Sequence, residues 1–372
     1  MGFVRPYFQH RLQTQGTAVF RWTAILLIVG LLGSLWTSCG KRDQAGTPPG
    51  PVYPYNPTPL SVILPNGWPA PAINIFAGNA PTEEGFQLGR RLFYDGRLSR
   101  DGNFPCASCH QQFAAFATFD HQFSHGFDNT FTNRNAPGLF NLAWLRELHM
   151  DGGIPDFISQ PASPITAINE MAETVDNVLR KLRADTMYHR LFTAAFGDTS
   201  ITYQRLASAL TQFVGTILSN NSKYDQVQRG QRSFDPAEQA GLQVFRSKCA
   251  TCHPEPLFTD LQYHNIGLSL DPILNDPGRM LITGNASDSL KFRTPSLRNV
   301  VVTFPYMHDG RLFTLTQVVE HYRSGIITSQ PTLSPSLRSR IPISNQERVD
   351  LIAFLQTLTD SVLLANPRFA QP

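Results

Sequence analysis

Two short motifs contain four of the five cysteines in the chain, and both follow the pattern Cys-x-x-Cys-His. The residues are Cys106, Cys109 and His110 in the first motif and Cys249, Cys252 and His253 in the second. This pattern is typical of c-type haem attachment, because two thiols at this spacing can form thioethers with one porphyrin and the next imidazole can bind its iron. The sequence therefore predicts two covalently bound c-type haems, each with a proximal histidine.

Two other chemistries use closely spaced cysteines. A zinc site built from both Cys-x-x-Cys pairs does not require a histidine directly after each pair. A redox dithiol of the thioredoxin type belongs to a β-α-β context, which this sequence does not show. Because the two motifs account for every cysteine except Cys39, haem attachment is the favoured interpretation.

The composition limits the remaining classes of protein. The chain has 372 residues, of which 41% are hydrophobic, so it is long enough for two or more domains with buried cores. The 31 Lys and Arg residues against 28 Asp and Glu residues leave a net charge of +3, which argues against a nucleic-acid-binding surface. Five cysteines are too few for a disulfide-stapled scaffold.

The amino-terminal segment predicts export. An apolar stretch at 23–38 follows a basic segment, as in a secretory signal, and the small residues before Cys39 resemble the lipobox of a bacterial lipoprotein. We therefore predict a signal peptide over 1–39, a lipid anchor on Cys39 and a periplasmic location. An uncleaved anchor helix, with Cys39 incidental, is the alternative. The Pro- and Gly-rich segment 40–75 is expected to be a tether between this membrane anchor and the body.

A helix is predicted before each Cys-x-x-Cys-His motif. The first covers about 82–94 and has Thr82 as its cap, and the second begins with the capping box of Asp235 and Glu238. The chain therefore contains a weak internal repeat, in which a helix precedes a haem motif twice.

Further helices are expected at 174–192 and 202–218, and another begins at the capping box of Ser344 and Glu347. No sustained run alternates like a strand. We predict a mainly α fold with two cytochrome c-like haem domains in tandem and long loops. The amino-terminal domain is expected to cover 76–230 and the carboxyl-terminal domain 231–365.

Several segments besides the haem motifs make the chain resemble the bacterial di-haem cytochrome c peroxidases, including their MauG branch. The segments are residues 88–99 (LGRRLFYDGRLS), Arg134 to Pro137, Asp151-Gly152, residues 294–300 (TPSLRNV), residues 305–310 (PYMHDG) and Thr314-Leu315. The resemblance covers about 80–360.

The resemblance implies that peroxide is cleaved at the amino-terminal haem and that the carboxyl-terminal haem receives electrons. Gln160 and Glu170 stand at the positions of the catalytic residues beside the peroxide. A carboxylate there can take a proton from hydrogen peroxide and return it to the leaving oxygen, while Gln160 orients the peroxide. Without the resemblance, Glu170 is a charged residue before a helix that stabilises the helix dipole.

The resemblance also implies iron ligands besides His110 and His253. His125 matches the histidine that binds the first iron in the resting state, and His121 is a local alternative. Tyr322 stands where the second iron has its sixth ligand, a methionine in many of these peroxidases and a tyrosine in MauG. Other candidates for that ligand are Met280, Met307 and His321.

The resemblance places oxygen ligands of a calcium ion at Asn135, Thr303 and Pro305, and calcium readily accepts backbone carbonyls. Met150 stands where the family usually has a tryptophan between the haems, and Trp144 lies six residues earlier.

The predicted activity is therefore the reduction of hydrogen peroxide to water with electrons from a small periplasmic donor, either a monohaem cytochrome c or a cupredoxin. One alternative is a MauG-like peroxide-dependent oxidase that acts on a partner protein. Another is a di-haem electron carrier without catalysis. The resemblance leaves a homodimer open.

Overall fold

The computed structural model describes residues 53–372. The predicted signal peptide, Cys39 and the first part of the predicted tether lie outside the described residues. Residues 53–372 form one compact unit. Within it, no helix has both the length and the apolar character needed to cross a membrane.

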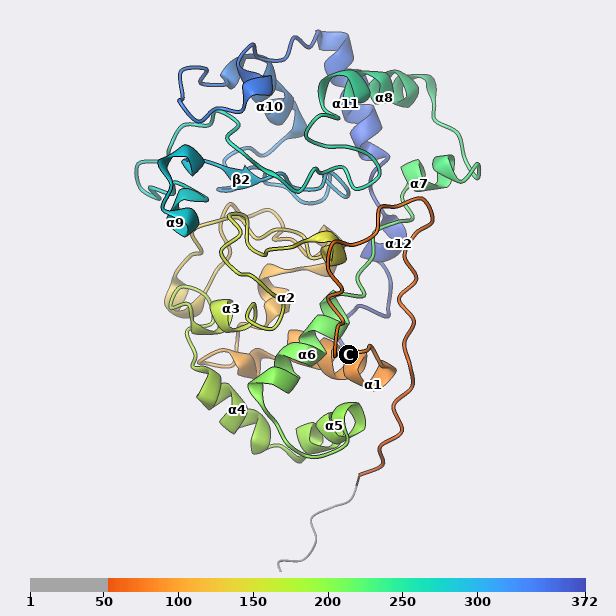
Figure 1. Ribbon diagram of the computed structural model, residues 1–372, viewed down its shortest axis with the longest axis vertical. Helices are drawn as coiled ribbons and strands as arrows, with labels where there is room; N and C mark the ends of the chain where they lie inside the picture. Colours follow the sequence, from red (N-terminus) through yellow and green to blue (C-terminus); the bar gives the residue numbers. More distant parts are fainter. Residues whose placement is uncertain (1–52) are drawn as a thin grey trace, which may run out of the picture. The chain divides into compact units, whose positions relative to one another are not determined.

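The described chain is mainly α, as predicted, with long loops between short helices (Figure 1). The α-helices are α1 (Glu83–Phe93), α2 (Cys106–Cys109), α3 (Ala162–Thr166), α4 (Val175–Arg183), α5 (Thr186–Phe196), α6 (Tyr203–Val214), α7 (Lys223–Gln228), α8 (Pro236–Lys248), α9 (Met280–Thr283), α10 (Leu315–Glu320), α11 (Asn345–Gln356) and α12 (Ser361–Leu364). Two short antiparallel strands, β1 (Tyr263–His264) and β2 (Phe292–Arg293), pair with each other.

The predicted helix starts are confirmed. The side chain of Thr82 accepts a hydrogen bond from the Gly85 amide at the start of α1, and both predicted capping boxes are present at α8 and α11. The prediction of one helix over 174–192 was wrong, because the Asp185 carboxylate caps a new helix, α5, by accepting from the Met187 amide.

The first hydrophobic core forms where α1 packs on α6. Gly89 permits this contact, since a Cβ atom there would lie 1.9 Å from the carbonyl oxygen of Ala209. Phe93 of α1 and Phe213 of α6 then meet with their ring centroids 5.2 Å apart, and Phe116 from the loop after α2 packs against both. These rings cover the region next to the first Cys-x-x-Cys-His motif.

The second core repeats this arrangement with α8 and α11, which lie side by side in Figure 1. A Cβ atom on Gly241 would lie 1.9 Å from the carbonyl oxygen of Asp350. Phe245 of α8 and Phe354 of α11 have centroids 5.1 Å apart, and Phe258 packs against both. The two halves of the chain therefore use the same close helix contact beside their motifs.

The end of the chain returns to the first core. Leu363 and Phe369 are buried there, and the hydroxyl of Tyr94 donates to the carbonyl oxygen of Phe369 at 2.8 Å. Figure 1 shows the carboxyl terminus next to α1. This contact joins residues beyond 365 to the predicted amino-terminal domain, whose boundaries stay a prediction.

Residues 53–75, the described part of the predicted tether, also lie on the body. The Trp68 ring contacts the ring of Trp144 with centroids 5.2 Å apart, and the Trp144 indole N–H donates to the Pro69 carbonyl at 2.7 Å. The guanidinium of Arg298 lies over the Trp68 ring, 4.4 Å from its centroid. This part of the segment is therefore held by specific contacts.

Candidate functional site

The first motif holds its histidine in one tautomer. Cys106 and Cys109 begin and end the single turn of α2, and His110 follows as the C-cap. The Nδ1–H group of His110 donates to the carbonyl oxygen of Phe116 at 2.7 Å. Burial lowers the pKa of His110, so its ring is neutral and Nε2 keeps a free lone pair. This nitrogen can therefore bind a haem iron.

The second motif repeats this geometry. The Nδ1–H group of His253 donates to the carbonyl oxygen of Phe258 at 3.0 Å, and burial lowers the pKa of His253. Phe116 and Phe258 both adopt a positive φ, which turns their carbonyl groups back toward the histidines. The chain therefore orients two imidazoles in the same way, each with Nε2 available.

The four motif cysteines are free and partly buried. Burial raises the pKa of Cys106 and of Cys249 to about 12, which keeps both thiols protonated. Cys249, Cys252 and His253 line a cavity of about 710 Å³. This volume is in the range of cofactor sites in proteins, and the ligand set fits an attached haem.

Tyr322, the predicted sixth ligand of the second iron, lines the same cavity. It lies in the π-helical turn His321–Gly325 that follows α10, and burial raises the pKa of its phenol. The imidazole of His321 contacts the carbonyl oxygen of Ile266 through Nε2 at 2.9 Å, so it is engaged elsewhere. Met307 also lines the cavity, whereas Met280 does not. Tyr322 therefore stays the favoured candidate.

Glu170 is partly buried beside the first motif. It follows α3, and its amide donates to the Ala167 carbonyl at 3.1 Å. Burial raises the pKa of Glu170, and the Glu170 carboxylate in turn contributes to the raised pKa values of Cys106 and Cys109. This carboxyl group therefore lies close to the sulfur atoms that would attach the first haem, and it can hold a proton nearer to neutral pH.

Gln160 lies directly before α3. Its Nε2 is 3.2 Å from Nε2 of His149, while its Oε1 is buried and has no hydrogen-bond partner among the described residues. A buried acceptor without a partner is uncommon and calls for a ligand or water. The side chain therefore offers an unused acceptor.

Comparisons with known proteins agree with this geometry. Residues 83–233 match the family model described as di-haem cytochrome c peroxidase. The methylamine utilization protein MauG of Methylophilus methylotrophus is 34% identical over 80% of this chain and 88% of its own length. The cytochrome c551 peroxidase of Nitrosomonas europaea is 31% identical over 73% of this chain and 79% of its own.

A crystal structure of a MauG-like protein associated with microbial copper homeostasis is 35% identical to the chain. The structural match covers 84% of this chain and 99% of the crystallised chain, with a TM-score of 0.75. The chain belongs to the di-haem cytochrome c peroxidase and MauG family. The protein is therefore an oxidoreductase of the peroxidase type, and its family carries two c-type haems.

His125 is exposed, in contrast to His110. It pairs with Phe131 across a hairpin, and its ring lies 5.3 Å from that of His121, which is also exposed. The structure therefore places neither imidazole in the buried surroundings expected of an iron ligand, and the role of His125 in the resting enzyme stays a prediction.

The three predicted calcium ligands line one cavity, the same one that contains the second motif. Asn135 is buried, and its Nδ2 donates to the carbonyl oxygens of His121 and Gln122, each at 3.2 Å. Its Oδ1 is thus the atom left for a cation, together with oxygen atoms of Thr303 and Pro305. The calcium site stays a prediction.

Met150 and Trp144 line this cavity too. Met150 belongs to a tight turn in which Leu148 pairs with Ile154, and the turn in which Tyr306 pairs with Leu312 has the same form. The structure therefore brings both Met150 and Trp144 to the cavity that contains the second motif.

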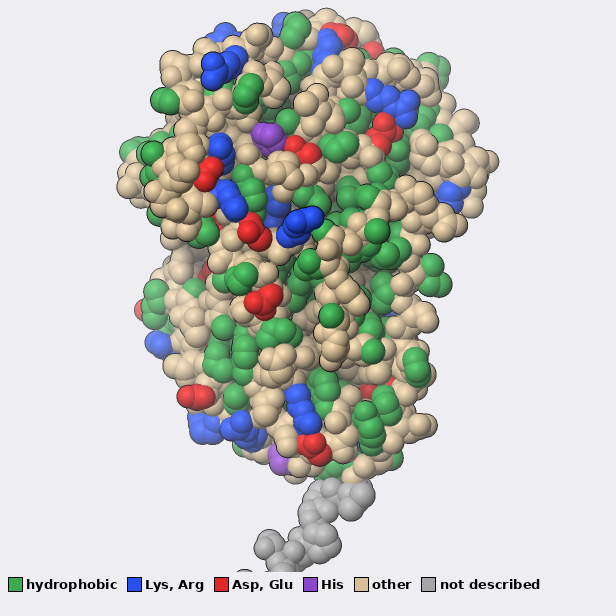
Figure 2. Space-filling model, viewed as in Figure 1, with side chains coloured by type: hydrophobic (Ala, Val, Ile, Leu, Met, Phe, Trp, Pro, Cys, Tyr) green, Lys and Arg blue, Asp and Glu red, His purple; other side chains and the backbone are tan. Residues whose placement is uncertain are grey.

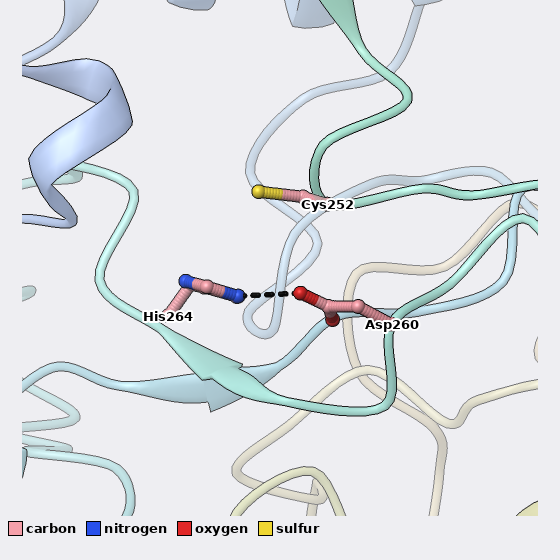
Figure 3. Close-up of side chains that lie close together, drawn as sticks. All are labelled: Cys252, Asp260 and His264. Atoms are coloured by element: carbon pink, nitrogen blue, oxygen red, sulfur yellow. Dashed lines mark hydrogen bonds and ion pairs between the residues drawn. The ribbon is translucent and has the colours of Figure 1, made fainter.

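A polar cluster borders the second motif (Figure 3). Ligand atoms of Cys252, Asp260 and His264 lie within 4.8 Å of one another, and His264 Nε2 is 2.8 Å from an Asp260 carboxylate oxygen. His264 Nδ1 lies 3.0 Å from the hydroxyl of Ser334. Because a thioether sulfur is no thiolate, Cys252 with attached haem would not complete a zinc-type site. Cys252 and His264 of this cluster line the cavity that contains the second motif.

Sequence reasoning missed His149 and Arg298. Arg298 is fully buried and forms a bidentate ion pair with Asp225, with both N–O distances 2.8 Å. The sequence does contain a signal near Arg298. The pattern Pro-x-Leu-x-Asn occurs at 137–141 and again at 295–299, and Arg298 lies in the second copy. No sequence pattern marks His149, whose partner Gln160 is found only in the folded chain.

Proposed function

We propose that this enzyme reduces hydrogen peroxide to water beside the first motif and receives electrons at the second motif from a small periplasmic redox protein. A monohaem cytochrome c or a cupredoxin has the required one-electron chemistry. The observation that carries the proposal is the partly buried carboxyl group of Glu170 near Cys106 and Cys109, whose pKa is raised by this burial.

Two cytochrome c-like domains in tandem are part of this proposal. The repeated glycine contact of Gly89 and Gly241, and the repeated hydrogen bond from each motif histidine to a phenylalanine carbonyl, support a duplicated haem-binding frame. Export, with a lipid anchor on Cys39, is proposed from the sequence alone. Figure 2 shows acidic and basic side chains interspersed over one face of the described residues, which is consistent with the absence of a nucleic-acid partner.

When bound, the haems would supply one-electron redox chemistry, and the haem held by Cys106, Cys109 and His110 would be the one at which peroxide is reduced. The protein supplies the proton handling. Glu170 accepts a proton from one peroxide oxygen and delivers it to the oxygen that leaves as water. Its burial makes this role feasible, since a carboxyl group with a raised pKa can be both protonated and deprotonated within the cycle.

Gln160 orients the peroxide through its free Oε1, which can accept a hydrogen bond from a peroxide O–H group. Tyr322 would hold the iron of the second haem, where a phenolate ligand would favour ferric iron and a methionine ligand would raise the reduction potential. The complete reaction takes up two electrons and two protons for each peroxide and releases two waters.

A second candidate function is a peroxide-dependent oxidase that acts on a partner protein. Tyr322, which lines the cavity that contains the second motif, favours this function. Sequence identities of 34% and 36% to MauG proteins of two organisms favour it too. A di-haem electron carrier is less well supported, because it gives no role to the Glu170 carboxyl group beside the first motif.

Anaerobic stopped-flow absorption tests the main proposal. The holoenzyme, with both haems attached, is mixed with ferrocytochrome c or a reduced cupredoxin and then with hydrogen peroxide. We expect two donors to be oxidised for each peroxide consumed. If both haems are present and neither donor is oxidised by peroxide, the peroxidase proposal is wrong, and oxidation of a partner protein becomes the hypothesis to test.

A further inference from the structure

We propose that His149 sets the orientation of the Gln160 carboxamide and thereby decides whether the peroxide site presents an oxygen acceptor or an NH₂ donor. His149 is a positioning residue in this proposal, because it contacts Gln160 and acts on the peroxide only through it. The inference rests on the proposed function of the first site.

The backbone fixes His149 in place. Leu148 and Ile154 pair across the turn, with the Leu148 amide donating to the Ile154 carbonyl at 2.7 Å, and His149 has a φ of 64°. Asp151 is buried and accepts from the Gly153 amide at 2.9 Å. The carboxylate of Asp151 also pairs with Arg134 at 2.5 Å. This anchored turn leaves the His149 side chain little freedom to move away from Gln160.

The contact selects one orientation of the amide. With His149 neutral and its proton on Nδ1, Nε2 is an acceptor, and the Gln160 NH₂ group donates to it over 3.2 Å. The Gln160 Oε1 then points away from His149, and it is the buried atom that has no partner among the described residues. The neutral imidazole thus leaves a free acceptor for a peroxide O–H group.

The surroundings keep His149 neutral. Burial lowers the pKa of His149, the nearby Arg134 and Arg293 lower it further, and only Asp151 opposes them. Arg134 is itself paired with Asp276, with an N–O distance of 2.6 Å. The ring therefore gains a proton only at a pH below the ordinary histidine value of about 6.5.

Protonation reverses the contact. A charged imidazole donates from both nitrogens, so the Gln160 amide must rotate until its Oε1 accepts from His149. The NH₂ group then faces the peroxide site, which loses its acceptor. We expect peroxide consumption to fall on acidification for this reason, in addition to any effect of Glu170.

The test compares the wild-type holoenzyme with His149→Leu, His149→Gln and the control His189→Leu. His189 is a partly buried histidine on α5 whose Nε2 contacts the Arg183 carbonyl at 2.8 Å, so its loss removes a similar hydrogen bond elsewhere. The first measurement is kcat/KM for hydrogen peroxide as a function of pH. The second is the infrared stretching frequency of carbon monoxide bound to the reduced first haem, also as a function of pH.

In the wild type and in His189→Leu, we expect kcat/KM to decrease as the pH falls below 6.5, and the carbon monoxide frequency to decrease as the NH₂ group turns toward the ligand. In His149→Leu the pH dependence of the carbon monoxide frequency should disappear, and kcat/KM should keep only the acid-side decrease that comes from Glu170. At neutral pH kcat/KM should be about five- to tenfold lower, the effect of one hydrogen bond. In His149→Gln, an uncharged acceptor remains, so activity at neutral pH should be retained, the carbon monoxide frequency should not change with pH, and only the acid-side decrease from Glu170 should remain.

A carbon monoxide frequency that does not change with pH in the wild type, or that changes equally in His149→Leu, would overturn the inference. If the frequency behaves as expected but the enzyme consumes no peroxide, the inference about His149 stands and the peroxidase proposal fails. The two hypotheses are therefore separable.

Discussion

The two motif regions share a frame but differ in what faces the proposed haem. In both, a glycine lets two helices meet closely, and a motif histidine donates to the carbonyl of a phenylalanine with positive φ. The first region adds the partly buried carboxyl group of Glu170, whereas the second adds the phenol of Tyr322. The shared frame can hold a cofactor in each region, and under the proposed function the side chains of Glu170 and Tyr322 are what make the two sites chemically different.

The regions are joined through buried polar contacts. Asn141 and Asn299 occupy equivalent places in the repeat and both have positive φ. The Ser219 amide donates to Oδ1 of Asn141 at 2.9 Å, and Asn299 Nδ2 donates to the Ser219 hydroxyl at 2.9 Å. One serine therefore contacts the repeated asparagine of each half.

The largest expected effect is on the chemistry of the first site. Glu170→Gln should lower peroxide turnover by about 10²–10⁴-fold, because an amide cannot transfer the proton. Stopped-flow absorption measures the rate, and haem content should stay at two. Glu320→Gln, a partly exposed carboxylate on α10, is the matched control. Equal rates in Glu170→Gln and the control would remove the proposed chemical difference between the two sites.

A large effect on stability is expected at Arg298 in the second region. Arg298→Met leaves Asp225 as an unpaired buried charge, which should lower the free energy of unfolding by about 3–5 kcal/mol. Combining it with Asp225→Asn should recover part of the loss. Denaturant unfolding followed by circular dichroism measures both variants. Equal stability of the single and double variants would contradict a direct pairing.

Tyr322→Met should raise the reduction potential of the second haem and change its absorption spectrum, since methionine stabilises ferrous iron relative to a phenolate. Spectroelectrochemical titration measures both haems separately, and the first should keep its potential. Met307→Leu is the control, because Met307 lines the same cavity. A spectrum that responds to Met307→Leu but not to Tyr322→Met would show that the ligand assignment is wrong.

The smallest effect concerns two Glu–Lys pairs, one in each region. Glu173 is buried and paired with Lys181, which lowers the pKa of Glu173 to about 2, while Glu347 pairs with Lys248 at the surface. A carboxylate whose pKa is lowered on folding stabilises the folded state at pH values above its pKa in the unfolded chain, which is about 4.3. This stabilisation is lost as the pH falls toward 2.

Glu173→Gln should therefore reduce stability at neutral pH by about 1–2 kcal/mol and much less near pH 2. Acid and denaturant unfolding measure the difference. Glu347→Gln should have a smaller effect, and one that high salt removes, because surface pairs are screened. Equal salt sensitivity of both variants would contradict the difference in burial.

The sequence by itself determined the features that depend on local chemistry. The two haem motifs follow from thiol and imidazole spacing, and the starts of α1, α8 and α11 follow from side chains that cap the nearest amides. The break at Asp185 is also local, but the apolar periodicity on both sides of it concealed the cap.

Only the tertiary structure decided which distant residues meet. The return of Phe369 to the first core, the packing of Trp68 on Trp144 and the contact of His149 with Gln160 all join segments whose separation in sequence carries no periodic signal. Such contacts depend on how whole helices and loops pack, and the same packing partly buries Glu170 and thereby raises its pKa. Spacing alone therefore predicts where the haems attach, and packing decides which side chains surround them.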